Sequence, residues 1–241
     1  MSAYRQNPLA NLSPVVKNLL ILNIIFFVAT WSLKKIGLVD LDLLLAAHYF
    51  DSPYFRVWQI ISYMFMHADI FHIFFNMFAL YVFGPMLEYT MGPKRFLQFY
   101  FITGLGALAL QMAVQAFEVH QIIGTFTVPG HDIRPYQYTA GYEYLWATYS
   151  AYGGIVGASG AIFGLLVAFG MLFPNVELFI MFIPLPVKAK YAVIGYIVWE
   201  LWGGLRPTPG DSVAHFAHLG GALLGFILIK VWRMQRPNNF Y

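Results

Sequence analysis

Residues 70–87 of the chain read IFHIFFNMFALYVFGPML, eighteen consecutive residues without Asp, Glu, Lys or Arg. A run of this length is typical of a helix that crosses a membrane, because about 20 apolar residues span the hydrocarbon core. Of the 241 residues, 59% are hydrophobic and only 10% are charged, whereas about 25% are charged in soluble proteins. The sequence therefore predicts an integral membrane protein and excludes an ordinary soluble domain, a disordered tail and a fibrous repeat.

Five further apolar segments flank this stretch on both sides. The six predicted spans cover residues 16–33, 70–87, 96–117, 155–173, 189–202 and 213–231. The expected fold is an all-α membrane protein, a bundle of six transmembrane helices. One domain is expected over residues 16–233, between cytoplasmic tails at residues 1–15 and 234–241.

The segments between the spans differ in character. Residues 34–66 mix charged residues with Leu, Phe, Tyr and Trp, so we expect amphipathic helices lying in the membrane interface. Residues 118–152 are polar and rich in Tyr, which predicts an aromatic loop at the interface. Residues 178–186 (LFIMFIPLP) are too short to cross and contain two prolines, so they are expected to dip into the interface.

The basic residues set the expected orientation. Six spans put both termini on one side, and that side carries nine of the 14 Lys and Arg residues. The positive-inside rule then places both termini in the cytoplasm. Because no signal or transit peptide is visible, the bacterial cytoplasmic membrane is the expected location.

The charge and cysteine content narrow the possible functions. The chain has no Cys, which excludes a disulfide framework, a thiolate metal site and a cysteine nucleophile. The net charge of +3 is explained by topology, so no nucleic-acid partner is expected.

Four places combine an apolar span with polar or ionisable side chains, which are costly in a membrane and are therefore functional candidates. They are His72 with Asn76, Ser159 within GASGAIFG (residues 157–164), His218 within HFAHLGGALLG (residues 215–225), and Glu200 near the end of the fifth span. The spans that begin near His72, Ser159 and His218 open on the same, non-cytoplasmic side. These three side chains are therefore expected at similar depth.

Ser159 and His218 form the candidate reactive pair, because a serine hydroxyl becomes a strong nucleophile only when a base accepts its proton. His72, Asn76 and the backbone N–H of Ser159 are candidates for stabilising an oxyanion. Small residues let two membrane helices approach closely. The glycines that permit this approach are Gly160 and Gly164 in one span and Gly221 and Gly225 in the other.

Other interpretations of the same residues remain open. Ser159 and its glycines are compatible with simple helix packing, and His72 with Asn76 could only tie helices together. A transporter or channel could use the histidines as a proton relay. A metal site formed by His67, His72, His215 and His218 is conceivable from the ligand types, although no carboxylate completes a convincing set.

The motifs taken together resemble the rhomboid family of intramembrane serine proteases, in an ordered series over residues 58–225. GASGAIFG resembles the family motif GxSG, and AHLGG (residues 217–221) resembles AHxxG. HIFFN (residues 72–76) resembles HxxxN, and GPMLEYTMGPKRF (residues 84–96) resembles GxxxExxxG.

The resemblance implies roles for individual residues. It makes Ser159 the nucleophile and His218 the general base, within a motif that includes Gly157, Gly160 and Gly221. It makes His72 and Asn76 oxyanion-stabilising residues, Glu88 a structural hydrogen-bonding residue, and Phe163 the aromatic residue that stacks on the histidine. The implied activity is an endopeptidase that cleaves transmembrane segments of other proteins with a Ser-His dyad, without a metal or cofactor.

One departure from the family pattern concerns the first loop. The family commonly has Trp-Arg there, whereas Trp58 is followed by Gln59 in this chain. Because that loop is structural, the departure bears on stability or substrate positioning rather than on the chemistry.

We also expect the fifth span to serve as a lateral gate, because it ends in Gly203 and Gly204, which would permit tilting.

Overall fold

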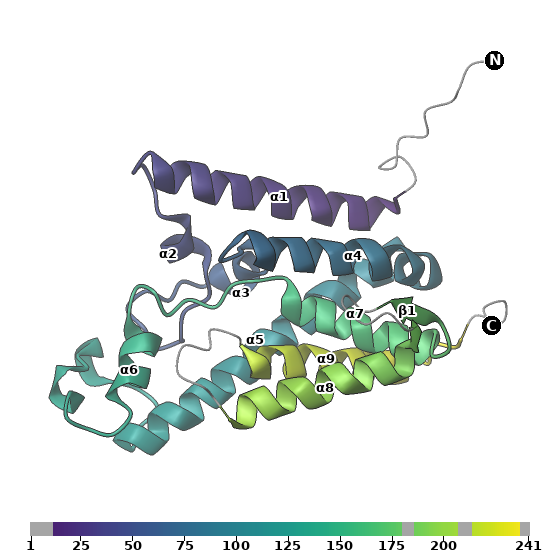
Figure 1. Cartoon of the computed structure of the whole chain (residues 1–241). Helices are drawn as coiled ribbons and strands as arrows, with labels where there is room; N and C mark the ends of the chain where they lie inside the picture. The colour runs from purple at the N-terminus through teal and green to yellow at the C-terminus, as the bar shows by residue number, and fades with distance from the viewer. Residues whose placement is uncertain (1–11, 180–185, 207–213, 237–241) are drawn as a thin grey trace, which may run out of the picture.

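The computed structural model describes residues 12–179, 186–206 and 214–236 and is mostly helical (Figure 1). Its α-helices are α1 (Pro14–Lys35), α2 (Leu41–Leu45), α3 (Gln59–Ser62), α4 (Ile70–Met91), α5 (Pro93–Ile123), α6 (Tyr142–Tyr149), α7 (Ser159–Leu172), α8 (Ala189–Leu205) and α9 (His215–Val231). Short 3-10 turns lie at Tyr63–Phe65, Pro129–His131 and Arg134–Tyr136. Most of the predicted N-terminal tail, the predicted start of the sixth span at Val213 and most of residues 178–186 lie outside the described residues.

The surface of the molecule is apolar around the long helices. Within the described residues, α1, α4 and α5 are long and apolar enough to cross a membrane, and α7 and α9 are shorter apolar helices. On α1, the side chains of Ile25, Val28 and Trp31 are more than half exposed. An extensive exposed apolar surface is unusual for a soluble monomer, so these helices are consistent with an integral, multi-pass membrane protein.

The centre of the fold is formed by α5, α7 and α9, which pack against one another. The helix α4 lies on α7 and separates it from α1, while α8 packs on the other side, against α7 and α9 (Figure 1). The core between these helices is filled by large side chains such as Phe96 and Phe99 of α5 and Leu165 and Phe169 of α7, which are all buried.

The helix α4 has well-defined ends. The side chain of Asp69 caps its start by accepting hydrogen bonds from the backbone N–H groups of Phe71 (2.8 Å) and His72 (2.9 Å). Such a cap satisfies N–H groups that have no partner within the helix. Gly92 ends α4 with φ +78°, and Pro93 at once begins α5. The chain therefore reverses within one residue at the end of α4 opposite to Asp69.

The first loop is organised around Gln59, the residue that departs from the family pattern. The side chain of Gln59 is fully buried. Its amide oxygen accepts hydrogen bonds from the backbone N–H of Arg56 (3.0 Å) and of His48 (3.3 Å), and its amide nitrogen donates to the carbonyl of Tyr54 (3.0 Å). The neutral amide of Gln59 thus connects three other positions of the loop. Amphipathic helices were expected in this loop, and its helical elements are the short helices α2 and α3 and a 3-10 turn.

Three further features differ from the sequence predictions. Two short strands, β1 (Glu177–Phe179) and β2 (Pro186–Lys188), pair in antiparallel orientation, so the all-α prediction is wrong for this small element. The helix α5 continues six residues beyond the predicted end at Phe117 because Val119 is buried against Tyr49 and Tyr149. The helix α7 begins at Ser159, four residues later than predicted.

Candidate active site

Ser159 and His218 face each other across the contact between α7 and α9. The Oγ atom of Ser159 lies 2.8 Å from Nε2 of His218, which is hydrogen-bonding distance. Ser159 is the first residue of α7, and His218 lies in the first turn of α9. Both helices start at the end of the bundle where α2, α3 and α6 gather (Figure 1). A serine hydroxyl bonded to an imidazole nitrogen is the arrangement that allows the histidine to accept the hydroxyl proton.

The turn before Ser159 explains why α7 begins where it does. Gly157 has φ +126°, a conformation that other residues rarely adopt. Its N–H donates to the carbonyl of Tyr63 (2.9 Å), and Ile155 pairs with Ala47 of the first loop through two backbone hydrogen bonds of 2.8 and 2.9 Å. These contacts hold residues 155–157 in an extended path, so that the helix cannot extend further back. Ser159 is thereby fixed at the helix N-terminus.

Glycines bring the backbones of α7 and α9 into direct contact. A Cβ added to Gly221 would overlap the carbonyl oxygen of Gly160, and one added to Gly225 would lie 2.7 Å from the carbonyl oxygen of Gly164. At Gly221 and Gly225, the space that a side chain would need is therefore filled by the backbone of the facing helix. This close approach is what allows the short side chain of Ser159 to reach His218.

His72 and Asn76 approach the same site from α4. A Cβ on Gly157 would lie 2.8 Å from Nε2 of His72 and 3.4 Å from Oγ of Ser159, so the imidazole of His72 lies against the turn that carries the serine. Asn76 is buried, and its side-chain nitrogen donates to the carbonyl of His72 (2.8 Å). Both side chains line the same cavity as Ser159 and His218.

The cavity has a volume of about 1180 Å³ and lies beside the Ser159–His218 pair. Its apolar walls include Phe71 and Phe75 of α4 and Val193 and Tyr196 of α8. The polar side chains of Ser159, His218, His72 and Asn76 therefore face a space that is bounded by two helices with exposed apolar surfaces. Such a space can hold an extended peptide segment.

Phe163 lies one turn after Ser159, and its ring stacks on the imidazole of His218. The ring centroids are 4.3 Å apart and the planes differ by 9°.

Glu88, in contrast, is not brought to the site. It lies 16 residues after His72 on α4, about 24 Å along the helix axis. There its carboxylate accepts hydrogen bonds from the backbone N–H groups of Val15 (3.0 Å) and Val16 (2.9 Å), in the first turn of α1.

The structure also brings Glu200 to the site, for which the sequence predicted no role beside Ser159 and His218. Its Oε2 atom lies 3.0 Å from Nδ1 of His218 and 2.6 Å from Nδ1 of His215. The signal available in the sequence was a carboxylate near the end of an apolar span. The order of residues in this span gave no information on whether the carboxylate faces α9 or the outside of the bundle.

The four histidines considered as metal ligands do not converge. The rings of His67 and His72 are neighbours, with centroids 5.0 Å apart, and His215 pairs with Glu200. Over residues 12–179, 186–206 and 214–236, no group of three or more His, Asp or Glu side chains is arranged to hold a metal ion. Gly203 and Gly204 provide space for the rings of His215 and Phe216. Their expected role in letting the fifth span tilt stays a prediction.

Comparison with known proteins identifies related chains. The family model described as "Rhomboid domain" matches residues 54–235. "Rhomboid protein 1, mitochondrial" of Saccharomyces cerevisiae is 28% identical over 170 residues, which cover 70% of this chain and 40% of that protein. "RHOMBOID-like protein 12, mitochondrial" of Arabidopsis thaliana is 30% identical over 189 residues, covering 77% of this chain and 48% of the relative.

A further relative carries a protease name. "Rhomboid protease AarA" of Providencia stuartii is 28% identical over 185 residues, which cover 71% of this chain and 54% of that protein. The chain thus spans about half the length of these three relatives.

Proposed function

The chain belongs to the rhomboid family, and we propose from its site that it is an intramembrane serine endopeptidase that cleaves transmembrane segments of other membrane proteins. The observation that carries this proposal is the 2.8 Å contact between Oγ of Ser159 and Nε2 of His218. The protease name of the relative from Providencia stuartii supports the same reaction. Other membrane proteins and the lipid bilayer are then the partners, and no cofactor takes part.

In the first step, Ser159 attacks the scissile carbonyl while its proton moves to Nε2 of His218. The new bond joins Oγ to the carbonyl carbon, and the carbonyl oxygen becomes an oxyanion. The backbone N–H of Ser159 belongs to the first turn of α7, where N–H groups lack helical partners and the helix dipole favours negative charge. With the side chains of His72 and Asn76, it would stabilise the oxyanion.

In the second step, His218 donates the proton to the leaving amine as the C–N bond breaks, which leaves an ester on Ser159. Water then attacks this ester, again with His218 as the base, and the hydroxyl of Ser159 is restored. The stacked ring of Phe163 keeps the imidazole in one orientation through both steps.

The membrane arrangement follows from the same proposal. The six spans would be α1, α4, α5, α7, α8 and α9, within a rhomboid domain of residues 16–233. The start of α1 and the end of α9 lie at the same end of the bundle (Figure 1), which suits an even number of crossings with both termini in the cytoplasm. Ser159 would then face the opposite side, in a cavity that a substrate helix enters between α4 and α8. A bacterial cytoplasmic membrane remains the proposed location.

The proposal is tested by labelling the detergent-purified chain with a fluorescent fluorophosphonate, which reacts with activated serines. Ser159→Ala and His218→Ala should each lower labelling by about 1000-fold or more, because the pair acts as a unit. The matched control is Ser150→Ala. Ser150 lines the same cavity, but its hydroxyl bonds to the carbonyl of Ala147 (3.5 Å), so this variant should label like the wild type.

Cleavage is measured on a single-span fusion protein reconstituted with the chain in liposomes, with the products identified by mass spectrometry. Products that depend on both Ser159 and His218 are expected. Labelling that survives Ser159→Ala, or a folded wild type that neither labels nor cleaves, would contradict the proposal and favour a proton relay or a non-catalytic binding protein.

A further inference from the structure

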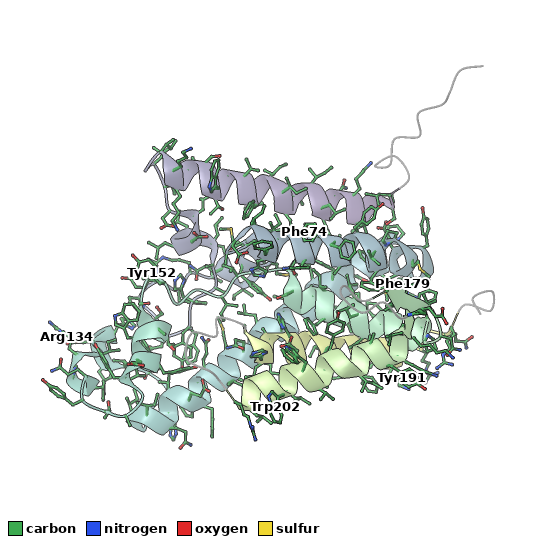
Figure 2. The ribbon with its side chains drawn as sticks, in the orientation of Figure 1. Phe74, Arg134, Tyr152, Phe179, Tyr191 and Trp202 are labelled. Atoms are coloured by element: carbon green, nitrogen blue, oxygen red, sulfur yellow. The ribbon has the colours of Figure 1, made fainter. Side chains whose placement is uncertain are left out.

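Glu200 is a buried carboxylate on a helix whose neighbouring residues face outward. As a whole residue it is only 6% exposed, whereas Trp199 and Trp202 are 70% and 59% exposed. Figure 2 shows Tyr191 and Trp202 on the outer side of α8. A carboxylate that faces the interior of an apolar bundle is costly unless it is paired, and in a membrane it is a functional candidate.

The partners of Glu200 are two histidines on one face of α9. His215 and His218 are three residues apart, so they are neighbours on the helix surface. The same oxygen, Oε2 of Glu200, lies 2.6 Å from Nδ1 of His215 and 3.0 Å from Nδ1 of His218. All three side chains are nearly buried, with exposures of 8% to 13%. The carboxylate is therefore shared between two imidazoles in a poorly hydrated space, where charge interactions are strong.

The two nitrogens of His218 face different partners. Nε2 faces Oγ of Ser159, and Nδ1 faces Oε2 of Glu200. For Nε2 to accept a proton, the hydrogen of the neutral ring must be on Nδ1. Nδ1 of His218 is buried and makes no well-aligned hydrogen bond to the described residues, so its close contact with the carboxylate is an ion-pair contact once the ring is charged. Ser159, His218 and Glu200 thus lie in the order hydroxyl, imidazole and carboxylate.

We propose that Glu200 is a positioning residue for His218 and converts the Ser-His pair into a three-residue relay. This rests on the proposed function of Ser159 and His218. When the proton of Ser159 moves to Nε2, the imidazole becomes positively charged, and the carboxylate of Glu200 stabilises this charge without taking the proton. Its negative charge also favours the form of the neutral ring that carries the hydrogen on Nδ1, the nitrogen that faces it. His215 bonds to the same oxygen and limits how much negative charge His218 experiences.

A purely structural role is the alternative. The contact with His215 is the shorter of the two, so Glu200 could act only as a tie between α8 and α9. The two roles differ in the pH dependence of the serine reaction. The ionisable groups around His218 are Glu200 from α8, His215 on its own helix and His72 from α4, which is close enough for its charge to interact with that of His218. A tie alone would leave the protonation of His218 unaffected.

The test follows the rate of fluorophosphonate labelling from pH 4 to 9 in the full chain. Glu200→Gln keeps the size and an acceptor oxygen but removes the charge. We expect it to slow labelling by about 10- to 100-fold, a part of what general-base catalysis contributes. We also expect the acidic limb of the profile to move to lower pH, because the charged form of His218 loses its anionic neighbour. His215→Leu leaves the carboxylate to His218 alone and should move this limb to higher pH.

The outcomes separate the two proposals. A wild type that labels, together with a Glu200→Gln variant of unchanged rate and unchanged acidic limb, would overturn the role of Glu200 and leave Ser159 and His218 as a dyad. If Glu200→Gln and His215→Leu both label more slowly but neither shifts the acidic limb of the pH profile, Glu200 is a structural tie only. A folded wild type that does not label overturns the proposed function and this role together. If Glu200→Gln does not fold, His215→Leu carries the test, and a limb that stays or moves to lower pH overturns the role.

Discussion

The ring of Phe163 lies flat on the imidazole of His218, with centroids 4.3 Å apart and planes that differ by 9°. Both rings project from residues near the starts of adjacent helices, so the stack spans the contact between α7 and α9. Offset stacking of aromatic rings contributes about 0.5–1.5 kcal/mol beyond the burial of their area. The stack therefore limits the rotation of the imidazole about its side-chain bonds.

The first prediction concerns this stack. Phe163→Leu retains an apolar side chain but removes the flat surface, so His218 should spend less time facing Ser159. We expect labelling by the fluorophosphonate to slow by about 3- to 10-fold, which corresponds to the stacking energy above. Phe163→Tyr retains the ring and is the control, which should label within about twofold of the wild type. Equal rates for the Leu variant and the wild type would show that the stack does not position His218.

The second prediction concerns the contact between α7 and α9. Gly221→Ala places a methyl group on the backbone carbonyl of Gly160, which no change of rotamer can relieve. We expect the variant to lose about 1–3 kcal/mol of stability, and also to lose labelling because Ser159 and His218 move apart. The measurement is thermal unfolding in detergent, followed by labelling of the fraction that remains folded.

Gly195→Ala on α8 is the matched control for this helix contact. A Cβ at Gly195 meets no atom within 4 Å, and replacing a helical glycine by alanine stabilises a helix by about 0.5–1 kcal/mol. The control should therefore unfold at the same temperature as the wild type or slightly above it. A Gly221→Ala variant as stable and reactive as this control would mean that the two helices do not need direct backbone contact.

The positions of the long helices could be predicted from the sequence, because uncharged apolar runs between charged or proline-containing segments define them. The start of α7 could not. It depends on hydrogen bonds from Gly157 and Ile155 to Tyr63 and Ala47, which are distant in the sequence. A pattern of neighbouring residues carries no information about such long-range contacts.

The candidate site, too, could be predicted from the sequence only in part. Ser159, His218, His72 and Asn76 could be identified because each is a polar residue at the start of an apolar segment. The contact of Glu200 with His218 could not, since it depends on the rotation of α8 relative to α9. That rotation is allowed by Gly203 and Gly204, which leave room for the rings of His215 and Phe216.

The third prediction concerns Glu88, whose buried carboxylate accepts hydrogen bonds from the N–H groups of Val15 and Val16. Glu88→Gln replaces one acceptor oxygen by an amide that would face an N–H donor. We expect a loss of about 1–3 kcal/mol in stability, the usual cost of an unsatisfied buried group. Labelling of the folded fraction should be unchanged, because Glu88 lies at the opposite end of α4 from His72.

Glu177→Gln is the control for this change. Glu177 is exposed on β1, and exposed substitutions usually change stability by less than about 0.5 kcal/mol. Thermal unfolding of both variants in the same detergent gives the comparison. If Glu88→Gln unfolds at the temperature of Glu177→Gln, the carboxylate does not stabilise the start of α1.

The fourth prediction concerns Asp51, which joins the first loop to the long linker between α5 and α7. One oxygen, Oδ2, accepts hydrogen bonds from the N–H of Val128 (2.7 Å) and from the hydroxyl of Tyr149 (2.8 Å). Burial, together with the hydrogen bond to Asp51, raises the pKa of Tyr149, so the phenol keeps its proton and remains a donor. Asp51→Asn removes the charge that strengthens both bonds.

Hydrogen bonds to charged groups contribute about 1.5–3 kcal/mol, so amide exchange at Val128 should accelerate by about 10- to 100-fold in Asp51→Asn. Hydrogen–deuterium exchange followed by mass spectrometry measures this in peptides from residues 124–141, with peptides from α7 and α9 as internal references. Asp42→Asn is the control, since Asp42 pairs with Lys34 (3.0 Å) in the exposed part of the same loop. Unchanged exchange at Val128 would show that the buried cluster of Tyr49, Val128 and Tyr149 holds the linker without Asp51, whereas acceleration confined to the linker would show that one carboxylate fixes it to the first loop.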